Sequence, residues 1–168
     1  MSITLANRQR TRRLDPRRLH PLVTALLAEL HLDPAQAELG ITFVSAGRMA
    51  QVNWDFLQHE GSTDVITFDH SAESMEPHCP PLPLHGELFV CVDDAVKQAR
   101  EFRTTWQSEV VRYIVHGVLH LLGHDDLSPA PRRRMKREEN RLVRRLGAQF
   151  NLAAVGRSAA KKKRAGKG

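Results

Sequence analysis

One long apolar segment constrains this chain more than any other feature of its sequence. Residues 106–122 follow a helical spacing, and eight of them are large aliphatic side chains that cover well over half of the helical circumference. A helix that is apolar on most sides has to be buried, so we expect it to lie centrally against a sheet. Its remaining stripe carries Glu109, Tyr113, His116 and His120.

Strands and helices are expected on both sides of this segment. β-rich runs predict four short strands, at residues 2–6, 41–44, 64–68 and 87–92. Helical periodicity and N-terminal caps predict four further helices, at residues 15–30, 48–57, 93–102 and 131–146. The four-proline segment at residues 71–85 is expected to be a loop. The fold class is therefore α+β, a small mixed sheet of about four strands covered by about five helices.

Charge is distributed unevenly along the 168 residues. Residues 156–168 hold six of the 25 basic side chains and no acid, which leaves 19 basic and 19 acidic side chains in the rest. A tail of this composition cannot bury enough surface to order itself, so we expect one domain over residues 1–150 and a disordered basic tail over 151–168. Because the body is neutral overall, any attraction to nucleic acid must come from where its charges lie.

The sequence also excludes some classes of protein. No apolar run approaches the roughly 20 residues that a membrane helix needs, and the first ten residues lack the apolar core of a signal peptide. Two cysteines are too few for a disulfide framework. We expect a soluble, cytoplasmic protein with no membrane partner, whose oligomeric state the sequence leaves open.

Two histidines of the central helix form a candidate metal clamp. His116 and His120 are four residues apart, so they share one helical face about 6 Å apart along the axis, and both rings can reach one ion. Gly123 then breaks the helix, because glycine readily adopts the left-handed conformation that turns a chain back. A residue after this turn can complete a three-ligand site with the fourth position open to water, and the candidates are Asp126 and His124.

The residue beside the first histidine argues against one class of enzyme. Zinc proteases use H-E-x-x-H, in which the glutamate is the general base. Here that position is Gly117, so a metallopeptidase would lack its base. The proton-transfer residues of the site cannot be assigned from this sequence.

Residues 116–126, HGVLHLLGHDD, carry a specific pattern. It resembles the hallmark H-G-x-L-H-L-x-G-Y-D-H of the YbeY-type endoribonucleases, and seven positions match: His116, Gly117, Leu119, His120, Leu121, Gly123 and Asp125. The resemblance extends to residues 52–53, 63–68 and 86–88 and to Met135, Glu139 and Leu142 of the last predicted helix. It covers about residues 40 to 147.

The resemblance implies a zinc-dependent, single-strand-specific bacterial endoribonuclease of rRNA maturation and ribosome quality control. Its implied ligands for one Zn²⁺ are His116, His120 and Asp126, the last standing where the family has a histidine. A carboxylate is a legitimate zinc ligand, so this set is chemically sound. The implied partners are ribosomal RNA and the small ribosomal subunit.

A second departure from the family concerns phosphate binding. Leu57 stands where the family carries an arginine that is proposed to meet the RNA phosphate, and a leucine cannot neutralise a phosphorane-like transition state. Arg48 and His59 are candidate substitutes. The alternative hypothesis is a metal-containing, ribosome-associated factor of the same fold without catalysis.

Two groups of arginines are candidates for RNA contact, since guanidinium groups can follow a phosphate backbone. One group forms the outer face of the last predicted helix, at Arg133, Arg137, Arg141 and Arg144. The other lies near the N-terminus, at Arg8, Arg10, Arg12 and Arg13.

Overall fold

The computed structural model of this chain describes residues 2–72 and 82–157. Its main sheet has four strands, in the order β1 (Ser2–Asn7), β3 (Ala37–Val44), β5 (Leu84–Cys91) and β4 (Val65–Asp69). The first three strands are parallel, and β4 pairs antiparallel with β5. A separate antiparallel pair joins β2 (Arg13–Leu14) to β6 (Gly156–Arg157).

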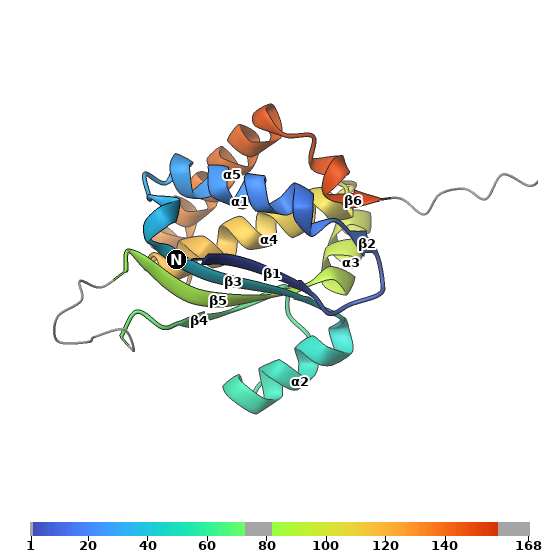
Figure 1. Ribbon diagram of the computed structural model, residues 1–168. Coiled ribbons are helices and arrows are strands. Elements are labelled where there is room, and N and C mark those ends of the chain that lie inside the picture. The colour runs from blue at the N-terminus through green and yellow to red at the C-terminus, as the bar shows by residue number, and fades with distance from the viewer. Residues whose placement is uncertain (1, 73–81, 158–168) are drawn as a thin grey trace, which may run out of the picture.

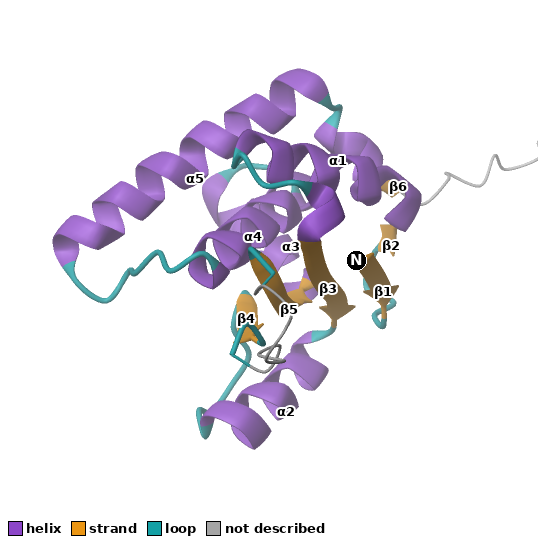
Figure 2. Cartoon of the chain, turned by 60° about the vertical axis from the view of Figure 1, so that its left-hand side comes forward, coloured by secondary structure: helices purple, strands orange, loops and turns teal. Residues whose placement is uncertain are grey.

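Five α-helices cover this sheet. They are α1 (Pro16–Glu29), α2 (Ala46–Leu57), α3 (Val92–Phe102), α4 (Trp106–Leu121) and α5 (Pro129–Gln149). Short 3₁₀ turns form η1 (Pro34–Gln36) and η2 (Leu152–Val155). Figure 1 shows α1, α4 and α5 on one face of the sheet and α2 on the other, and in Figure 2 α4 lies between α5 and the sheet. The predicted α+β class with a four-strand mixed sheet is confirmed.

Helix α4 is the central helix that its sequence predicts. Seven of its eight predicted apolar residues lie within Trp106–Leu121, and six of those seven are at most 1% exposed. Gly117 lets the helix approach the sheet closely, because a Cβ there would lie 2.8 Å from Leu88 Cδ2 and 3.1 Å from Val65 Cγ2. The backbone of α4 therefore rests directly on the side chains of β5 and β4.

Several element boundaries differ from the predicted ones. Strand β3 begins at Ala37, four residues before the strand predicted at residues 41–44. The alternation of buried and less buried residues starts there, ahead of the apolar run on which the prediction is based. Strand β5 begins at Leu84, inside the segment expected to be a loop, and residues 73–81 of that segment lie outside the described residues. Helix α1 begins at Pro16 as predicted, with the Asp15 side chain accepting a hydrogen bond from Arg17 N. Pro21 lies within the helix without delaying its start.

Helix α3 begins one residue before the predicted start at residue 93 and has no side-chain cap. Its N-cap is Cys91, and both aspartates lie in the first turn. The Asp93 carboxylate accepts hydrogen bonds from Thr11 Oγ1 and from the backbone N–H of Ala46, each at 2.5 Å. This carboxylate is therefore used to join the β1–β2 connection and α2 to α3.

The expected domain boundary at residue 150 needs a correction. Residues 152–157 form η2 and β6, and Val155 is 2% exposed. Its carbonyl accepts a hydrogen bond of 2.8 Å from the backbone N–H of Asp15. Residues 152–157 are thus attached to β2 and to the start of α1, and residues 158–168 lie outside the described residues. Within the described part of the chain, none of the helices has the length and apolarity to cross a membrane.

Because α4 packs so closely against the sheet at Gly117, replacing this glycine with alanine should destabilise the protein, although alanine has the higher helix propensity. Gly117→Ala should lower the free energy of unfolding by about 1–3 kcal/mol, because the added methyl group would overpack the core against the fully buried Leu88. Chemical denaturation measures this change. Gly147→Ala in α5 is the matched control, since its Cβ would meet only Leu152 Cδ1 at 3.8 Å. It should raise stability by about 0.5–1 kcal/mol through helix propensity, and equal effects at the two sites would contradict the close seat.

Candidate metal centre

The end of α4 and the connection after it bring three metal-ligating side chains together. Nε2 of His116 and Nε2 of His120 lie 3.0 Å apart. Oδ2 of Asp126 lies 3.7 Å from the first of these nitrogens and 3.5 Å from the second. All three side chains are partly exposed, so they could bind an ion that remains open to solvent on one side. We call these residues the triad.

The turn that returns Asp126 to the helix forms at Gly123, as the sequence predicts. This glycine has a φ of 91°, in the left-handed region that favours glycine. The backbone N–H of His124 donates to Leu119 O at 3.0 Å, which closes the helix end. Only Asp126, of the two candidates for the third position, has its side chain in the triad.

The spacing of the donor atoms fits zinc. A zinc ion lies about 2.1 Å from its nitrogen and oxygen ligands, so the corners of a tetrahedron around it are about 3.4 Å apart. The three donor separations in the triad, 3.0, 3.5 and 3.7 Å, bracket this value. Two imidazoles and one carboxylate are also ligand types that zinc accepts, with a fourth position left for another ligand.

The far side of each imidazole is held by an outer partner. Nδ1 of His116 lies 2.9 Å from Oε2 of Glu139, and Nδ1 of His120 lies 3.1 Å from the backbone carbonyl oxygen of His124. A donated hydrogen bond from each Nδ1 directs each Nε2 lone pair toward the triad, which is the usual arrangement of metal-binding histidines. His124 therefore contacts this site through its backbone carbonyl oxygen.

Glu139 is a buried carboxylate that joins α5 to α4. Its Oε1 accepts from Arg112 Nη1 at 2.7 Å and from Lys136 Nζ at 2.9 Å. Burial alone would raise the pKa of Glu139, but the hydrogen bonds from His116, Arg112 and Lys136 outweigh it and lower the pKa to about 2. Burial alone would lower the pKa of His116, whereas its bond to Glu139 and the neighbouring carboxylates raise it overall. Glu139 thus stays ionised and holds the ring of His116 in place.

Two hollows adjoin the triad. The α2-side hollow, of about 410 Å³, is lined by the triad, the end of α2 and the start of β4. The α5-side hollow, of about 170 Å³, is lined by His116, Asp126 and residues of α4 and α5. Both are also lined by Asp64, which sequence reasoning had included only as part of a matched segment. A carboxylate directly before a strand, with no partner expected from the sequence, was the available signal.

The residues considered for phosphate binding lie in different places relative to the two hollows. Leu57 and His59 both line the α2-side hollow, while Arg48 is absent from its lining and bonds Gln51 on α2 instead. Sequence reasoning missed Arg132, which lines the α5-side hollow and donates from Nε to the backbone oxygen of Asp126 at 2.8 Å. Arg132 thus brings a positive charge directly beside the triad.

The fold and the triad together define an α+β domain with a partly exposed His-His-Asp group that could hold a metal ion. Comparison with known proteins identifies its relatives. The family model for Endoribonuclease YbeY matches residues 4–147. A protein named Endoribonuclease YbeY from Chlorobium phaeovibrioides is 36% identical over 149 residues, which cover 88% of this chain and 93% of that protein. One of the same name from Anaeromyxobacter sp. is also 36% identical, over 88% of this chain and 73% of its own.

The chain belongs to the YbeY endoribonuclease family. A solved structure agrees with the fold: the solution structure of a Thermotoga maritima protein has a TM-score of 0.62 at 21% identity, and the match covers 97% of this chain and 100% of that one.

The buried Glu139 predicts an effect on metal affinity without loss of a ligand. Glu139→Gln should weaken zinc binding by about 10- to 100-fold, because the outer partner of His116 loses its charge. Competition with a chromophoric chelator measures the affinity. Glu138→Gln is the matched control, since that side chain pairs with Arg141 and contacts neither histidine of the triad. The same loss in both variants would mean that charge in general, and not the contact to His116, sets the affinity.

Proposed function

We propose that this chain is a metal-dependent, single-strand-specific endoribonuclease that acts on ribosomal RNA in its maturation and in ribosome quality control. One Zn²⁺ per chain is held by His116, His120 and Asp126. The observation that carries the proposal is the convergence of these three donors beside two hollows, in a chain whose family relatives are named endoribonucleases. The proposed partners are ribosomal RNA and the small ribosomal subunit, which places the activity in the cytoplasm.

The chain's own residues prepare this site before any ion is bound. Glu139 and the carbonyl of His124 hold the two imidazoles with Nε2 facing Asp126, so the donors need little rearrangement. When bound, zinc would act as a Lewis acid that polarises a phosphate or lowers the pKa of water. The carboxylate of Asp126 makes the donor set more negative than three imidazoles, so a weaker activation of water is expected than in a three-histidine site.

Phosphate has to be held by cations other than the family's arginine. Leu57 is 46% exposed in the α2-side hollow and offers no charge there. Arg132 can take this role from the opposite hollow. Its Nε donates to the Asp126 carbonyl, and its two terminal nitrogens make no hydrogen bond or ion pair among the described residues. A guanidinium beside the triad would stabilise charge that develops on a transferring phosphate.

The second candidate function is a metal-containing, ribosome-associated factor that binds RNA without cleaving it. The observation that favours it is Leu57, which removes a cation from the hollow beside the triad. A zinc-loaded sample that binds ribosomal RNA but never cleaves it would support this candidate and contradict the first.

The ligand assignment predicts a graded result in three single variants. His116→Ala and Asp126→Ala should lose more than about 100-fold in zinc affinity, because even outer partners are worth 10- to 100-fold, and RNA cleavage should fall with the metal content. His124→Ala should retain zinc, since only its backbone carbonyl contacts His120. Metal analysis of the purified variants and a gel assay on single-stranded RNA measure both effects. Full cleavage by His116→Ala would contradict the proposed function.

Replacement of the arginine beside the triad tests how phosphate is held. Arg132→Gln should lower kcat/KM for RNA by about 10- to 100-fold with zinc content unchanged, because transition-state charge loses a stabilising cation. Arg134→Gln is the control, from the same turn of α5, and lies outside both hollows of the triad. If both variants cleave at the wild-type rate, phosphate is held elsewhere.

A further inference from the structure

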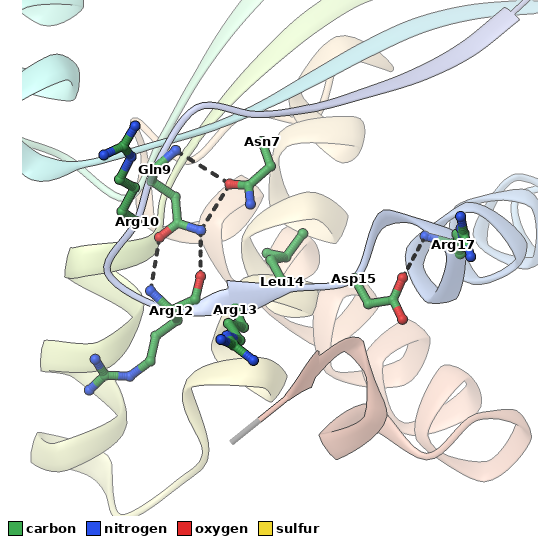
Figure 3. A pocket seen from close by; sticks show the side chains of 8 residues that line it. All are labelled: Asn7, Gln9, Arg10, Arg12, Arg13, Leu14, Asp15 and Arg17. Carbon is green, nitrogen blue, oxygen red and sulfur yellow. Dashed lines mark hydrogen bonds between the residues drawn. The ribbon is translucent and has the colours of Figure 1, made fainter. Parts of the chain in front are cut away.

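A second concave, basic surface lies away from the triad, where β1 leads into α1. Its main hollow, of about 530 Å³, is lined by four arginines, Arg10, Arg12, Arg13 and Arg17 (Figure 3). A neighbouring hollow of about 390 Å³ shares Arg12 and is also lined by Arg100 and Arg103 of the α3–α4 region. We call these six residues the arginine patch.

Apart from one hydrogen bond of Arg12, the guanidinium groups of the arginine patch have no partner in the described part of the chain. Among residues 2–72 and 82–157, none of the six lies within 4.0 Å of a carboxylate, and only Arg12 donates a side-chain hydrogen bond, to the neighbouring Thr11 carbonyl. On α4 and α5, by contrast, Arg112, Arg141 and Arg145 each pair with a glutamate. The patch therefore offers charge that an external anion can take.

The connection that carries these arginines is held in one shape by a buried amide. Gln9 is 6% exposed. Its Nε2 donates to Asn7 Oδ1 at 2.9 Å and to the Arg12 carbonyl at 2.8 Å, and its Oε1 accepts from Arg12 N at 3.0 Å. Figure 3 shows this amide at the centre of the turn, with Arg10, Arg12 and Arg13 projecting from it. Less entropy is lost on binding when the chain that presents the charges is already ordered.

Two of the acids near the patch, Asp15 and Asp93, have other partners. Asp15 lines the main hollow, and its carboxylate accepts from Arg17 N as the cap of α1. Asp93 is engaged by Thr11 and Ala46. The lysine-rich residues 158–168 carry the same sign of charge as the patch, so this segment is no electrostatic complement for it.

We propose that the arginine patch binds the phosphate backbone of the RNA strand, as a second contact separate from the metal centre. This inference rests on the proposed function and adds a binding site to it. Trp106 lines the neighbouring hollow of the patch and His116 lies ten residues further along α4, so that hollow is about 15 Å from the triad along the helix axis. Guanidinium groups in a hollow suit phosphate oxygens, to which arginine can donate two hydrogen bonds at once.

A triple variant tests the patch: Arg10→Gln, Arg13→Gln and Arg17→Gln together. Its affinity for a 2′-O-methyl single strand of about 20 nucleotides should fall by about 10- to 100-fold at about 0.1 M salt, and the slope of log affinity against log salt should fall by about 2. Fluorescence anisotropy with the zinc-loaded full chain measures both, on a probe verified to stay intact. Thermal denaturation verifies folding, which should be unchanged because the three side chains are exposed.

The control removes the same charge from the other group of arginines that the sequence makes a candidate for RNA contact, in the triple variant Arg133→Gln, Arg137→Gln and Arg144→Gln of α5, so the two groups are compared directly. These side chains are also exposed, and they line neither of the patch hollows. In the control variant, the slope of log affinity against log salt should fall by less than about a third of the fall in the patch variant. Equal losses in the two triple variants, or wild-type affinity in the patch variant, would overturn the proposal.

Cleavage of unmodified RNA by the wild-type chain, measured in parallel, separates this inference from the proposed function. If the wild-type chain cleaves nothing while the patch variant still loses affinity, the nuclease proposal fails and the patch is supported. If the wild-type chain cleaves and the patch variant binds as the wild type does, the patch alone is overturned.

Discussion

The contact of α4 with the sheet sets the position of everything else in the site. Residue 117 has no side chain, so the helix backbone lies against Leu88 and Val65 with no intervening atoms. His116 directly precedes this contact and His120 follows it by three residues, so the seat of the helix also sets the height of both imidazoles above β4. The same contact explains why this fold has no place for a peptidase glutamate at residue 117: any side chain there would meet the core and not the metal site.

A buried charge is the second constraint, and it joins packing to chemistry. Glu139 would be costly to bury alone, but it accepts from three groups on two helices. Each acceptor oxygen has a different task, since Oε1 fastens α5 to α4 through Arg112 and Oε2 orients His116. Removing a partner from such a pair leaves an uncompensated charge, so the packing of α5 and the orientation of a metal ligand are not independent.

Much of this could be read from the sequence because the governing interactions are local. The spacing of His116 and His120 predicts a shared face, and Gly123 predicts the reversal, since both follow from backbone geometry within a few residues. The choice between Asp126 and His124 depends on the path of the chain after the turn, which local geometry does not determine. Glu139 did leave a signal: it stands four residues after Met135 and three before Leu142, inside the buried stripe of α5. A carboxylate at such a position predicts a buried partner, but the partner is on another helix and is known only after folding.

The arrangement of charge shows why net charge says little about binding. Residues 1–155 carry equal numbers of acids and bases, which alone predicts no attraction to a polyanion. In the folded chain, three glutamates form ion pairs with arginines and a lysine around α5: Glu29, Glu138 and Glu139. Near the arginine patch, Asp15 caps a helix and Asp93 joins two segments of the chain. Because the fold neutralises its bases unevenly, a positive surface remains on the connection between β1 and α1, and our proposal is that a long RNA strand gains phosphate contacts there which a short one cannot.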